Sequence, residues 1–283
     1  MFNWPQNTKS TQDWGSKCLV KQLKEYQPMT MPENKKSKAL GIIPSRWAST
    51  RFPGKPLAEI GGRPMIEWVY RNASRAQSLD QLIVATDDQR IFDVVRGFGG
   101  EVVMTRSDHP SGTDRCAEVA KQLNDFDTII NIQGDEPFIA PEQIDLLVHL
   151  MAGAPLFQIG TLARPITEAA FIENPNVVKV VFDKYKRALY FSRSVLPFQR
   201  EEGTGVIYYQ HLGIYAFKRD VLLKLSCLEP TVLERTESLE QLRWLEHGYV
   251  IGLGTTQSET VSIDHPEDIH LAEAWINNHK NNL

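Results

Sequence analysis

Three cationic side chains lie close together after the first apolar segment of the chain. The sequence IIPSRWASTRFPGKPL, residues 42–57, contains Arg46, Arg51 and Lys55. In one loop bounded by Pro and Gly, these charges repel one another unless an anion lies between them. Arginine binds phosphate oxygens through two donors and lysine adds a movable point charge, so the loop predicts a polyphosphate site. A solvated basic loop is the alternative, and the loop has neither a Walker A nor a G-x-G-x-x-G pattern.

Two carboxylates stand where later apolar segments end. The sequence NIQGDEPF, residues 131–138, presents Asp135 beside Glu136, and VSIDHPEDI presents Asp264. Carboxylates beside phosphate-binding cations indicate Mg²⁺, which proteins commonly hold through one or two carboxylates together with phosphate oxygens. Each position also has a simpler interpretation, because Gly-Asp is typical of a turn and either Asp264 or His265 can cap the helix that Pro266 opens.

Further polar residues have side-chain types suited to a nucleotide or a sugar. In SDHPSGTDR, residues 107–115, hydroxyls and backbone amides of Ser111, Gly112 and Thr113 can surround a ligand at the start of a helix. An ordinary capped loop fits this segment equally well. Arg193, at the end of an apolar segment, can pair with a substrate carboxylate.

The second half of the chain carries a histidine and a helical group of polar residues. His211 lies within an apolar segment, where a hydrogen-bonded strand histidine is the favoured interpretation. Glu237 and Glu240 share one face of a predicted helix, next to Gln241. A solvated helix face is the usual meaning of that pattern.

Alternating apolar and amphipathic segments must position these residues. Compact apolar runs predict strands, and segments with apolar residues at helical spacing predict helices between them. The predicted strands span 39–43, 82–86, 101–105 and 128–133, and the predicted helices span 64–77, 87–100, 113–123 and 141–151. This alternation is typical of βαβ units in a mostly parallel, doubly wound sheet. A ligand is then expected at the carboxyl ends of its strands.

The pattern changes in the second half of the chain. Two strands around a polar turn predict a hairpin, and another strand, a helix, two short strands and a closing helix follow. These segments span 177–183, 188–193, 210–217, 237–248, 249–254, 259–264 and 266–278. We therefore expect a Rossmann-like α/β fold with an inserted antiparallel part at about 177–247.

Length, charge and cysteine usage exclude several classes of protein. The chain has 283 residues, with 31 Lys and Arg against 35 Asp and Glu, so the formal net charge is −4. This balance argues against a nucleic-acid-coating protein, and no apolar run reaches the roughly 18 residues that membrane insertion requires. Cys18, Cys116 and Cys227 lack metal or disulfide spacing, which favours free thiols in a reducing cytoplasm. The polar, arginine-free residues 1–37 predict a flexible extension, not a secretory signal, before a catalytic unit at 38–283.

Nine motifs occur in an order that carries a family resemblance. They are IPSRWASTRFPGKPL, VATDD, GGEVVMTRSDHPSGTDR, NIQGDEP, NPNVVKVV, ALYFSR, HLGIYAF, LEQLR and IDHPEDI. Over residues 38–280 the chain resembles the 3-deoxy-manno-octulosonate (KDO) cytidylyltransferases. The resemblance implies a nucleotidyltransferase fold, a cytoplasmic homodimer, and Mg²⁺-dependent transfer of CMP from CTP to KDO with release of diphosphate, a step in lipopolysaccharide biosynthesis.

The resemblance also implies roles for residues of this chain. Arg46, Arg51 and Lys55 would bind the CTP phosphates. Asp135 and Asp264 would hold Mg²⁺ and complete the implied catalytic set. The implied CTP site further includes Ser111, Gly112, Thr113 and Gln133, and the implied sugar site includes Gln133, Arg193, His211, Tyr215, Glu240 and Gln241.

Two positions depart from the family pattern, and two alternative functions remain. Ser45 stands where the family usually has Ala, and His265 stands where it often has Thr, but neither change removes an implied ligand. A cytidylyltransferase for 8-amino-KDO or a sialic acid is one alternative. An inert sugar-nucleotide sensor is the other, and the presence of Asp135, Asp264 and Lys55 argues against it.

Overall fold

A run of apolar residues forms the first strand, β1 (Ala39–Ser45), and nearly all of its side chains are buried. The computed structural model describes residues 37–48, 52–201, 203–259 and 261–279. The predicted N-terminal extension therefore lies outside the described residues apart from Ser37, and its flexibility stays a prediction. The chain from Ser37 onward forms one structural unit.

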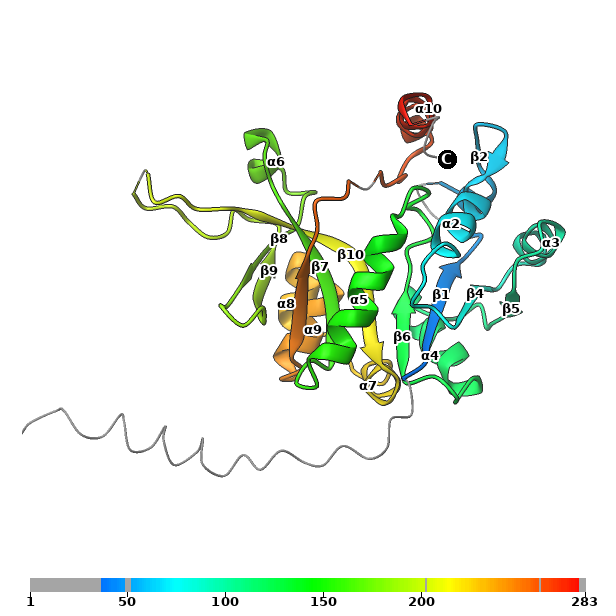
Figure 1. Cartoon of the computed structure of the whole chain (residues 1–283), viewed down its shortest axis with the longest axis horizontal. Helices are drawn as coiled ribbons and strands as arrows, with labels where there is room; N and C mark the ends of the chain where they lie inside the picture. Colours follow the sequence, from blue (N-terminus) through cyan, green and yellow to red (C-terminus); the bar gives the residue numbers. More distant parts are fainter. Residues whose placement is uncertain (1–36, 49–51, 202, 260, 280–283) are drawn as a thin grey trace, which may run out of the picture. The chain divides into compact units, whose positions relative to one another are not determined.

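One large sheet runs through the described part of the chain in the order β11–β7–β10–β6–β1–β4–β5 (Figure 1). Its other strands are β4 (Gln81–Thr86), β5 (Val102–Met104), β6 (Thr128–Asn131), β7 (Ile159–Pro165), β10 (Tyr209–Lys218) and β11 (Ile251–Thr255). β1 pairs in parallel with β4 and β6, and β7 pairs in parallel with β11. β10 is antiparallel to both β6 and β7 and joins the two parallel groups. The predicted mostly parallel sheet is confirmed.

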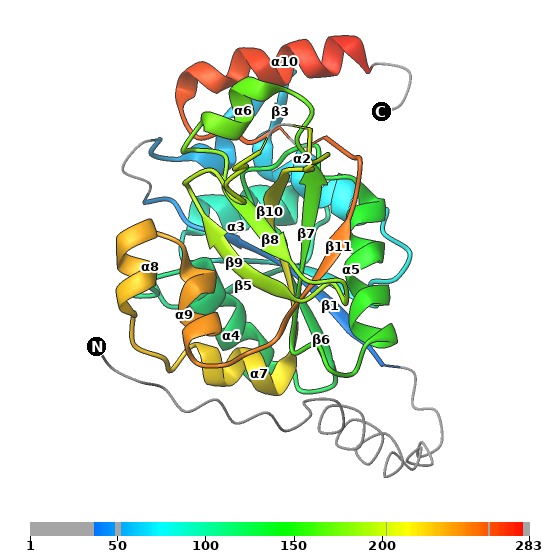
Figure 2. The same ribbon diagram turned by 90° about the vertical axis from the view of Figure 1, so that its left-hand side faces the viewer.

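Helices cover both faces of this sheet, as a doubly wound fold requires. One core cluster packs α2 (Met65–Ala73), α3 (Gln89–Gly97) and α5 (Pro141–Gly153) against the strands. The other packs α4 (Gly112–Gln122), α7 (Arg219–Leu225) and α9 (Glu240–Glu246) against the opposite face. Figure 2 shows α5 and α9 on opposite sides of the sheet.

The antiparallel part contains the predicted hairpin, formed by β8 (Lys179–Phe182) and β9 (Ala188–Ser192). β8 also pairs with β10, so the hairpin extends the main sheet. Short elements complete the described chain: η1 (Lys55–Leu57), β2 (Glu59–Ile60), β3 (Arg63–Pro64), α6 (Ala169–Glu173), α8 (Val232–Glu237) and η2 (Pro266–Asp268). Among the described residues, no helix is both long and apolar enough to span a bilayer.

Two expectations about elements were wrong, and one strand was missed. The helix predicted over 237–248 is two helices, α8 and α9, separated at Ser238, whose φ of 52° lies in the left-handed region. The strand predicted over 259–264 is absent from its described residues, because Ile263 bonds to a loop, not to a sheet neighbour. Strand β7 was not predicted at all, although it pairs with both β10 and β11.

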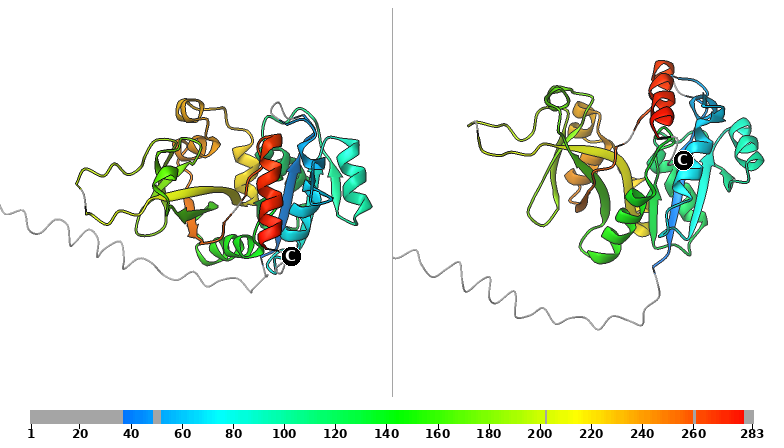
Figure 3. Two further views of the ribbon diagram at one scale, coloured as in Figure 1. Left: turned by 90° about the horizontal axis from the view of Figure 1, so that it is seen from above. Right: turned by 45° about the horizontal axis from the view of Figure 1, so that its top comes forward.

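A last helix, α10 (Ile269–Asn278), lies beside α2 and β2 (Figure 3). It packs through a third, smaller core cluster that includes Ile60, Trp68 and Phe138. This cluster is separate from the two that cover the main sheet. It connects the end of the described chain to the loop that follows β6.

Candidate active site

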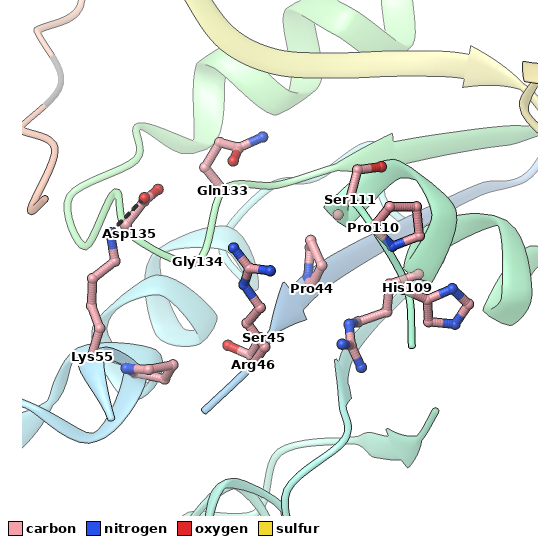
Figure 4. A pocket seen from close by; sticks show the side chains of 13 residues that line it. Pro44, Ser45, Arg46, Lys55, His109, Pro110, Ser111, Gln133, Gly134 and Asp135 are labelled. Carbon is pink, nitrogen blue, oxygen red and sulfur yellow. Dashed lines mark hydrogen bonds and ion pairs between the residues drawn. The ribbon is translucent and has the colours of Figure 1, made fainter. Parts of the chain in front are cut away.

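A cavity of about 240 Å³ opens at the carboxyl ends of β1 and β6, where the sequence placed the ligand (Figure 4). Several residues expected to bind phosphate, nucleotide or sugar line it together. The lining comprises Pro44, Ser45, Arg46, Lys55, Pro56, His109, Pro110, Ser111, Gly112, Arg115, Gln133, Gly134 and Asp135. Segments far apart in the sequence thus meet at one edge of the sheet, as the parallel topology predicts.

Lys55 lies where three oxygen atoms from two other segments converge. Its Nζ is 2.8 Å from Oδ2 of Asp135 and 3.6 Å from Oδ1 of Asp264. It also donates a hydrogen bond of 2.6 Å to the carbonyl oxygen of Ile263. Figure 4 shows the Lys55 side chain reaching Asp135 along the cavity wall. The cation expected to face phosphate is therefore also paired with both carboxylates and offsets part of their negative charge.

The loop between Arg46 and Lys55 is braced by an aromatic ring. The backbone amide of Gly54 bonds to the Trp47 carbonyl at 3.1 Å, and the left-handed Gly54 lies against the Trp47 ring. The Arg90 guanidinium covers that ring, 3.3 Å from its centroid. A cation–π contact of this kind is attractive and helps to fix the Trp47 ring beside Gly54. Arg46 lines the cavity and is exposed, whereas Arg51 lies outside the described residues.

Asp135 and Asp264 are brought together by the backbone, not by two strand ends. Asp135 follows β6, as predicted, but Asp264 lies in an irregular segment. The amide of Ile263 donates a hydrogen bond of 3.0 Å to the Asp135 carbonyl oxygen and places the next residue beside it. Of the two capping candidates, His265 is the N-cap residue of η2 and Asp264 is not. The Asp268 carboxylate accepts hydrogen bonds of 2.8 Å from the backbone amides of Asp264 and His265.

Burial changes the acidity of Glu136, the neighbour of Asp135. Its side chain is buried, and burial together with the charge of Asp135 raises the pKa of Glu136 to about 8. A carboxyl with this pKa is mostly protonated at neutral pH. The negative charge of the QGDEP loop is consequently concentrated on Asp135.

The residues expected to surround cytidine contact a residue expected to bind the sugar. Ser111 caps α4, and its hydroxyl lies 3.1 Å from Oε1 of Glu240. Thr113 donates a hydrogen bond of 2.8 Å to Oε2 of the same carboxylate. Burial raises the pKa of Glu240, and the two hydroxyls oppose that shift. The solvated-face interpretation is wrong for this helix, since the adjacent Gln241 is only 4% exposed.

Of the other expected sugar residues, His211 and Tyr215 lie on β10 and Arg193 directly follows β9. Among the whole predicted sugar set, only Gln133 lines the 240 Å³ cavity. The Nε2 group of Gln133 donates a hydrogen bond of 2.8 Å to the carbonyl oxygen of Gly213. This carbonyl lies where the pairing of β10 with β7 is irregular, between Leu212 and Tyr215. His211 Nε2 lies 3.0 Å from the Thr161 hydroxyl, and burial lowers the pKa of His211 to about 3. Tyr215 is buried, and burial with the Glu240 charge raises its pKa.

Arg193 is held by neighbouring backbone groups. Its Nε donates a hydrogen bond of 2.7 Å to the carbonyl oxygen of Glu237, and its Nη1 donates one of 3.0 Å to the carbonyl oxygen of Pro175. The Glu237 carboxylate in turn accepts the Arg193 amide and the Ser192 hydroxyl. Arg193 is thereby fixed between β9 and the end of α8, and its predicted contact with a substrate carboxylate stays a prediction.

Two residues of the cavity wall, Arg115 and His109, were missed by sequence reasoning. Arg115, which is 3% exposed, donates a hydrogen bond of 3.0 Å to Oδ2 of Asp87 and also contacts the Thr105 hydroxyl. His109 pairs with Glu118. Both residues lie in the SDHPSGTDR motif, and a search for charges flanking its Ser-Gly-Thr core would have found them.

The sequence of this chain is similar to those of known proteins. A family model described as cytidylyltransferase matches residues 40–259. A protein of Leptospira interrogans serovar Lai, named 3-deoxy-manno-octulosonate cytidylyltransferase, is 52% identical over 234 residues, covering 83% of this chain and 94% of that protein. The chain belongs to the 3-deoxy-manno-octulosonate cytidylyltransferase family. A Bacteroides thetaiotaomicron protein with the same name is 50% identical over 250 residues, covering 85% and 99% of the two chains.

A solved structure extends the likeness to three dimensions. It is that of a CMP:2-keto-3-deoxy-manno-octonic acid synthetase complexed with CTP, which aligns with a TM-score of 0.82 at 41% identity. The alignment covers 86% of this chain and all of that one. The nucleotidyltransferase fold implied by the motifs is therefore confirmed, and this member of the 3-deoxy-manno-octulosonate cytidylyltransferase family shares it over nearly all described residues.

We expect His211 to stay neutral in the folded protein down to about pH 3, because burial lowers its pKa. In the unfolded chain the same imidazole binds a proton below its ordinary pKa of about 6.5. The free energy of unfolding should therefore fall as the pH drops from 6.5 toward 3, by up to about 1.4 kcal/mol per pH unit from this group. Urea unfolding of wild type and His211→Gln across this range measures the difference, and the variant should show the shallower fall.

The matched control is His149→Gln, because His149 is an exposed histidine on α5. Its pH dependence should follow that of the wild type. An NMR titration in which the His211 imidazole of the folded protein takes up a proton near pH 6.5 would contradict the prediction.

Proposed function

We propose that this chain transfers CMP from CTP to KDO, yielding CMP-KDO and diphosphate for lipopolysaccharide biosynthesis. The observation that carries the proposal is the cavity in which Arg46 and Lys55 share one wall with Asp135 and the Ser111–Gly112 segment. Cations suited to a triphosphate thus lie beside a carboxylate and beside hydroxyl and amide groups suited to a nucleoside. The names of the relatives supply the substrates, since those proteins are KDO cytidylyltransferases.

Mg²⁺ is the proposed cofactor, held by Asp135 and Asp264. The donor set fits Mg²⁺, because oxygen atoms of Asp135, Asp264 and Ile263 converge on one positive charge. In this structure that charge is the Lys55 ammonium. The described residues contain no group of three or more His, Cys, Asp or Glu placed to hold a metal. Mg²⁺ commonly uses only one or two carboxylates and takes its other ligands from phosphate and water. When bound, Mg²⁺ supplies charge neutralisation at phosphate and lowers the pKa of a coordinated hydroxyl.

The residues of the chain bind and orient the reactants. Arg46 and Lys55 face the same cavity, where their charges stabilise the diphosphate leaving group, and Arg51 is proposed to act with them. Ser111, Gly112 and Thr113 are proposed to hold cytidine at the start of α4. The attack of the sugar hydroxyl on the α-phosphorus needs positioning and charge stabilisation more than covalent help from the protein.

The proposed sugar site lies on the antiparallel side of Gln133. His211 stays neutral, so it contributes a hydrogen bond without adding charge. Glu240 bridges to Ser111 and Thr113, which couples the sugar side to the nucleotide side. Arg193, directly after β9, Tyr215 on β10 and Gln241 on α9 complete the set.

We also propose that the enzyme is a cytoplasmic homodimer. Large apolar side chains are exposed on the β8–β9 hairpin and on the connection from β9 to β10. They include Tyr185 at 64%, Leu189 at 60%, Phe198 at 84% and Ile207 at 58% exposure. Exposed apolar side chains gathered on one part of a molecule favour association with a partner surface. A soluble nucleotide substrate and free cysteines are consistent with the cytoplasm.

The substrate proposal is tested by diphosphate release. We expect release from CTP in the presence of KDO and Mg²⁺, with much slower release when CTP is replaced by another nucleoside triphosphate. Faster turnover with 8-amino-KDO or with a sialic acid would identify that sugar, and not KDO, as the substrate. Binding of CTP without release of diphosphate from any of these sugars would favour the inert sensor.

The two carboxylates are tested by removing their charge. Asp135→Asn and Asp264→Asn should each lower kcat by about 100-fold or more, because a preorganised electrostatic contact to the reacting phosphate is lost. Steady-state diphosphate release measures the effect, and circular dichroism verifies that each variant is folded. Asp220→Asn, on the exposed side of α7, is the control and should retain wild-type turnover. Wild-type kcat in either site variant would remove that residue from the proposed cation site.

The homodimer is tested by molar mass in solution. Light scattering should give twice the chain mass of 32.2 kDa for the wild type. Phe198→Glu and Ile207→Glu should shift the mass toward one chain, since a buried charge opposes an apolar interface. Leu156→Glu, at a residue 62% exposed between α5 and β7, is the control and should remain dimeric. A wild-type mass of one chain would overturn the proposal.

A further inference from the structure

Asp264 depends on long-range contacts for its position. It lies between β11 and η2, in a segment whose described residues form no strand or helix. Ile263, directly before it, is fully buried and bonds through its backbone to Asp135 and Lys55. Directly after it, the turn of η2 begins, and Asp268 accepts the amides of Asp264 and His265. What holds this turn against the rest of the molecule therefore also sets the place of the Asp264 carboxylate.

The turn continues without a break into α10, which is docked by an aromatic stack. The rings of Trp275 and Phe138 are nearly parallel, with centroids 4.0 Å apart and an interplanar angle of 12°. Trp68 meets Phe138 edge-on at 5.8 Å, and His279 stacks on Trp275 at 4.2 Å. Aromatic pairs at these distances add stabilisation beyond the area that they bury.

The stack joins the two segments that carry the carboxylates. Phe138 belongs to the QGDEPF loop, three positions after Asp135. Trp275 belongs to the helix that follows Asp264. The two rings meet within the small cluster formed by Ile60, Met65, Trp68, Phe138, Ile263 and Ala272, apart from the two main cores. The cluster thus closes a ring of contacts around the Asp135–Lys55–Asp264 group.

We infer that Trp275 is a positioning residue for the proposed cation site. Its stacking on Phe138 docks α10 and thereby keeps the Asp264 carboxylate beside Asp135. The inference rests on the proposed role of the two carboxylates. The ring contacts of Trp275 are with Phe138 and His279, so its effect on Asp264 is proposed to act through the helix, much as residues that support metal ligands fix their orientation.

Two substitutions at Trp275 test whether an aromatic ring stacked on Phe138 is what the site requires. Trp275→Ala removes the ring, whereas Trp275→Phe keeps an aromatic face toward Phe138. Asn277→Ala is the control, because Asn277 is exposed on the same helix. The full-length protein is used throughout. Mn²⁺ alone is the probe, and its binding is followed by electron paramagnetic resonance without substrates.

We expect Trp275→Ala to weaken Mn²⁺ binding by about 10-fold or more. A loss of metal affinity of this size is typical when a residue that supports the metal ligands is replaced. Trp275→Phe and Asn277→Ala should stay within about twofold of the wild type. In the turnover assay, Trp275→Ala should need about 10-fold more Mg²⁺ for half-maximal rate, and saturating Mg²⁺ should restore most of kcat. Hydrogen exchange should quicken at residues 263–279 and not in β1 or β6.

Two outcomes would overturn the inference. One is unchanged Mn²⁺ affinity in Trp275→Ala while Asp264→Asn weakens it, which would leave the proposed cation site intact and remove only Trp275. The other is a loss of kcat in Trp275→Ala that saturating Mg²⁺ does not restore, which would show that the substitution does not act through the cation site. Failure of the proposed function is distinct, because Asp264→Asn would then leave both Mn²⁺ binding and turnover unchanged.

Discussion

The candidate site depends on one electrostatic contact, the convergence of Asp135, Asp264 and the Ile263 carbonyl on the Lys55 ammonium. Two carboxylates held this close repel each other unless a positive charge lies between them. Lys55 provides that charge from the short helix after the Trp47–Gly54 loop. Three segments that are distant in the sequence are thereby tied at one point of the cavity wall.

The sheet brings these segments within reach of one another. β1 and β6 are parallel neighbours, so the loops that follow them emerge at the same edge. β10 enters between β6 and β7 in the opposite direction, and its irregularity exposes the Gly213 carbonyl to Gln133. The parallel half and the antiparallel half consequently meet at the strand that carries the QGDEP loop. Glu240 adds a second link between the halves through Ser111 and Thr113.

Burial controls the charge of the polar groups around this junction. It lowers the pKa of His211 and raises the pKa values of Glu136, Glu240 and Tyr215. In each case the shift favours the neutral form, because a charged group loses hydration on burial. Arg46 is exposed, and Lys55, Asp135 and Asp264 are partly exposed to solvent. The net charge of −4 does not show that these four ionisable groups are gathered at one site.

The sequence by itself determined the local features: the strands around 39–43 and 128–133, the alternation with helices, and the loops that carry Arg46, Lys55, Ser111 and Asp135. Hydrophobic periodicity and capping residues encode such features within a few neighbours along the chain. The tertiary structure decided the rest. Asp264 is placed by the Ile263–Asp135 backbone bond, Glu240 by two hydroxyls on another helix, and α10 by the Phe138–Trp275 stack. These interactions join residues about 100 or more positions apart, and no local pattern specifies which distant groups will meet.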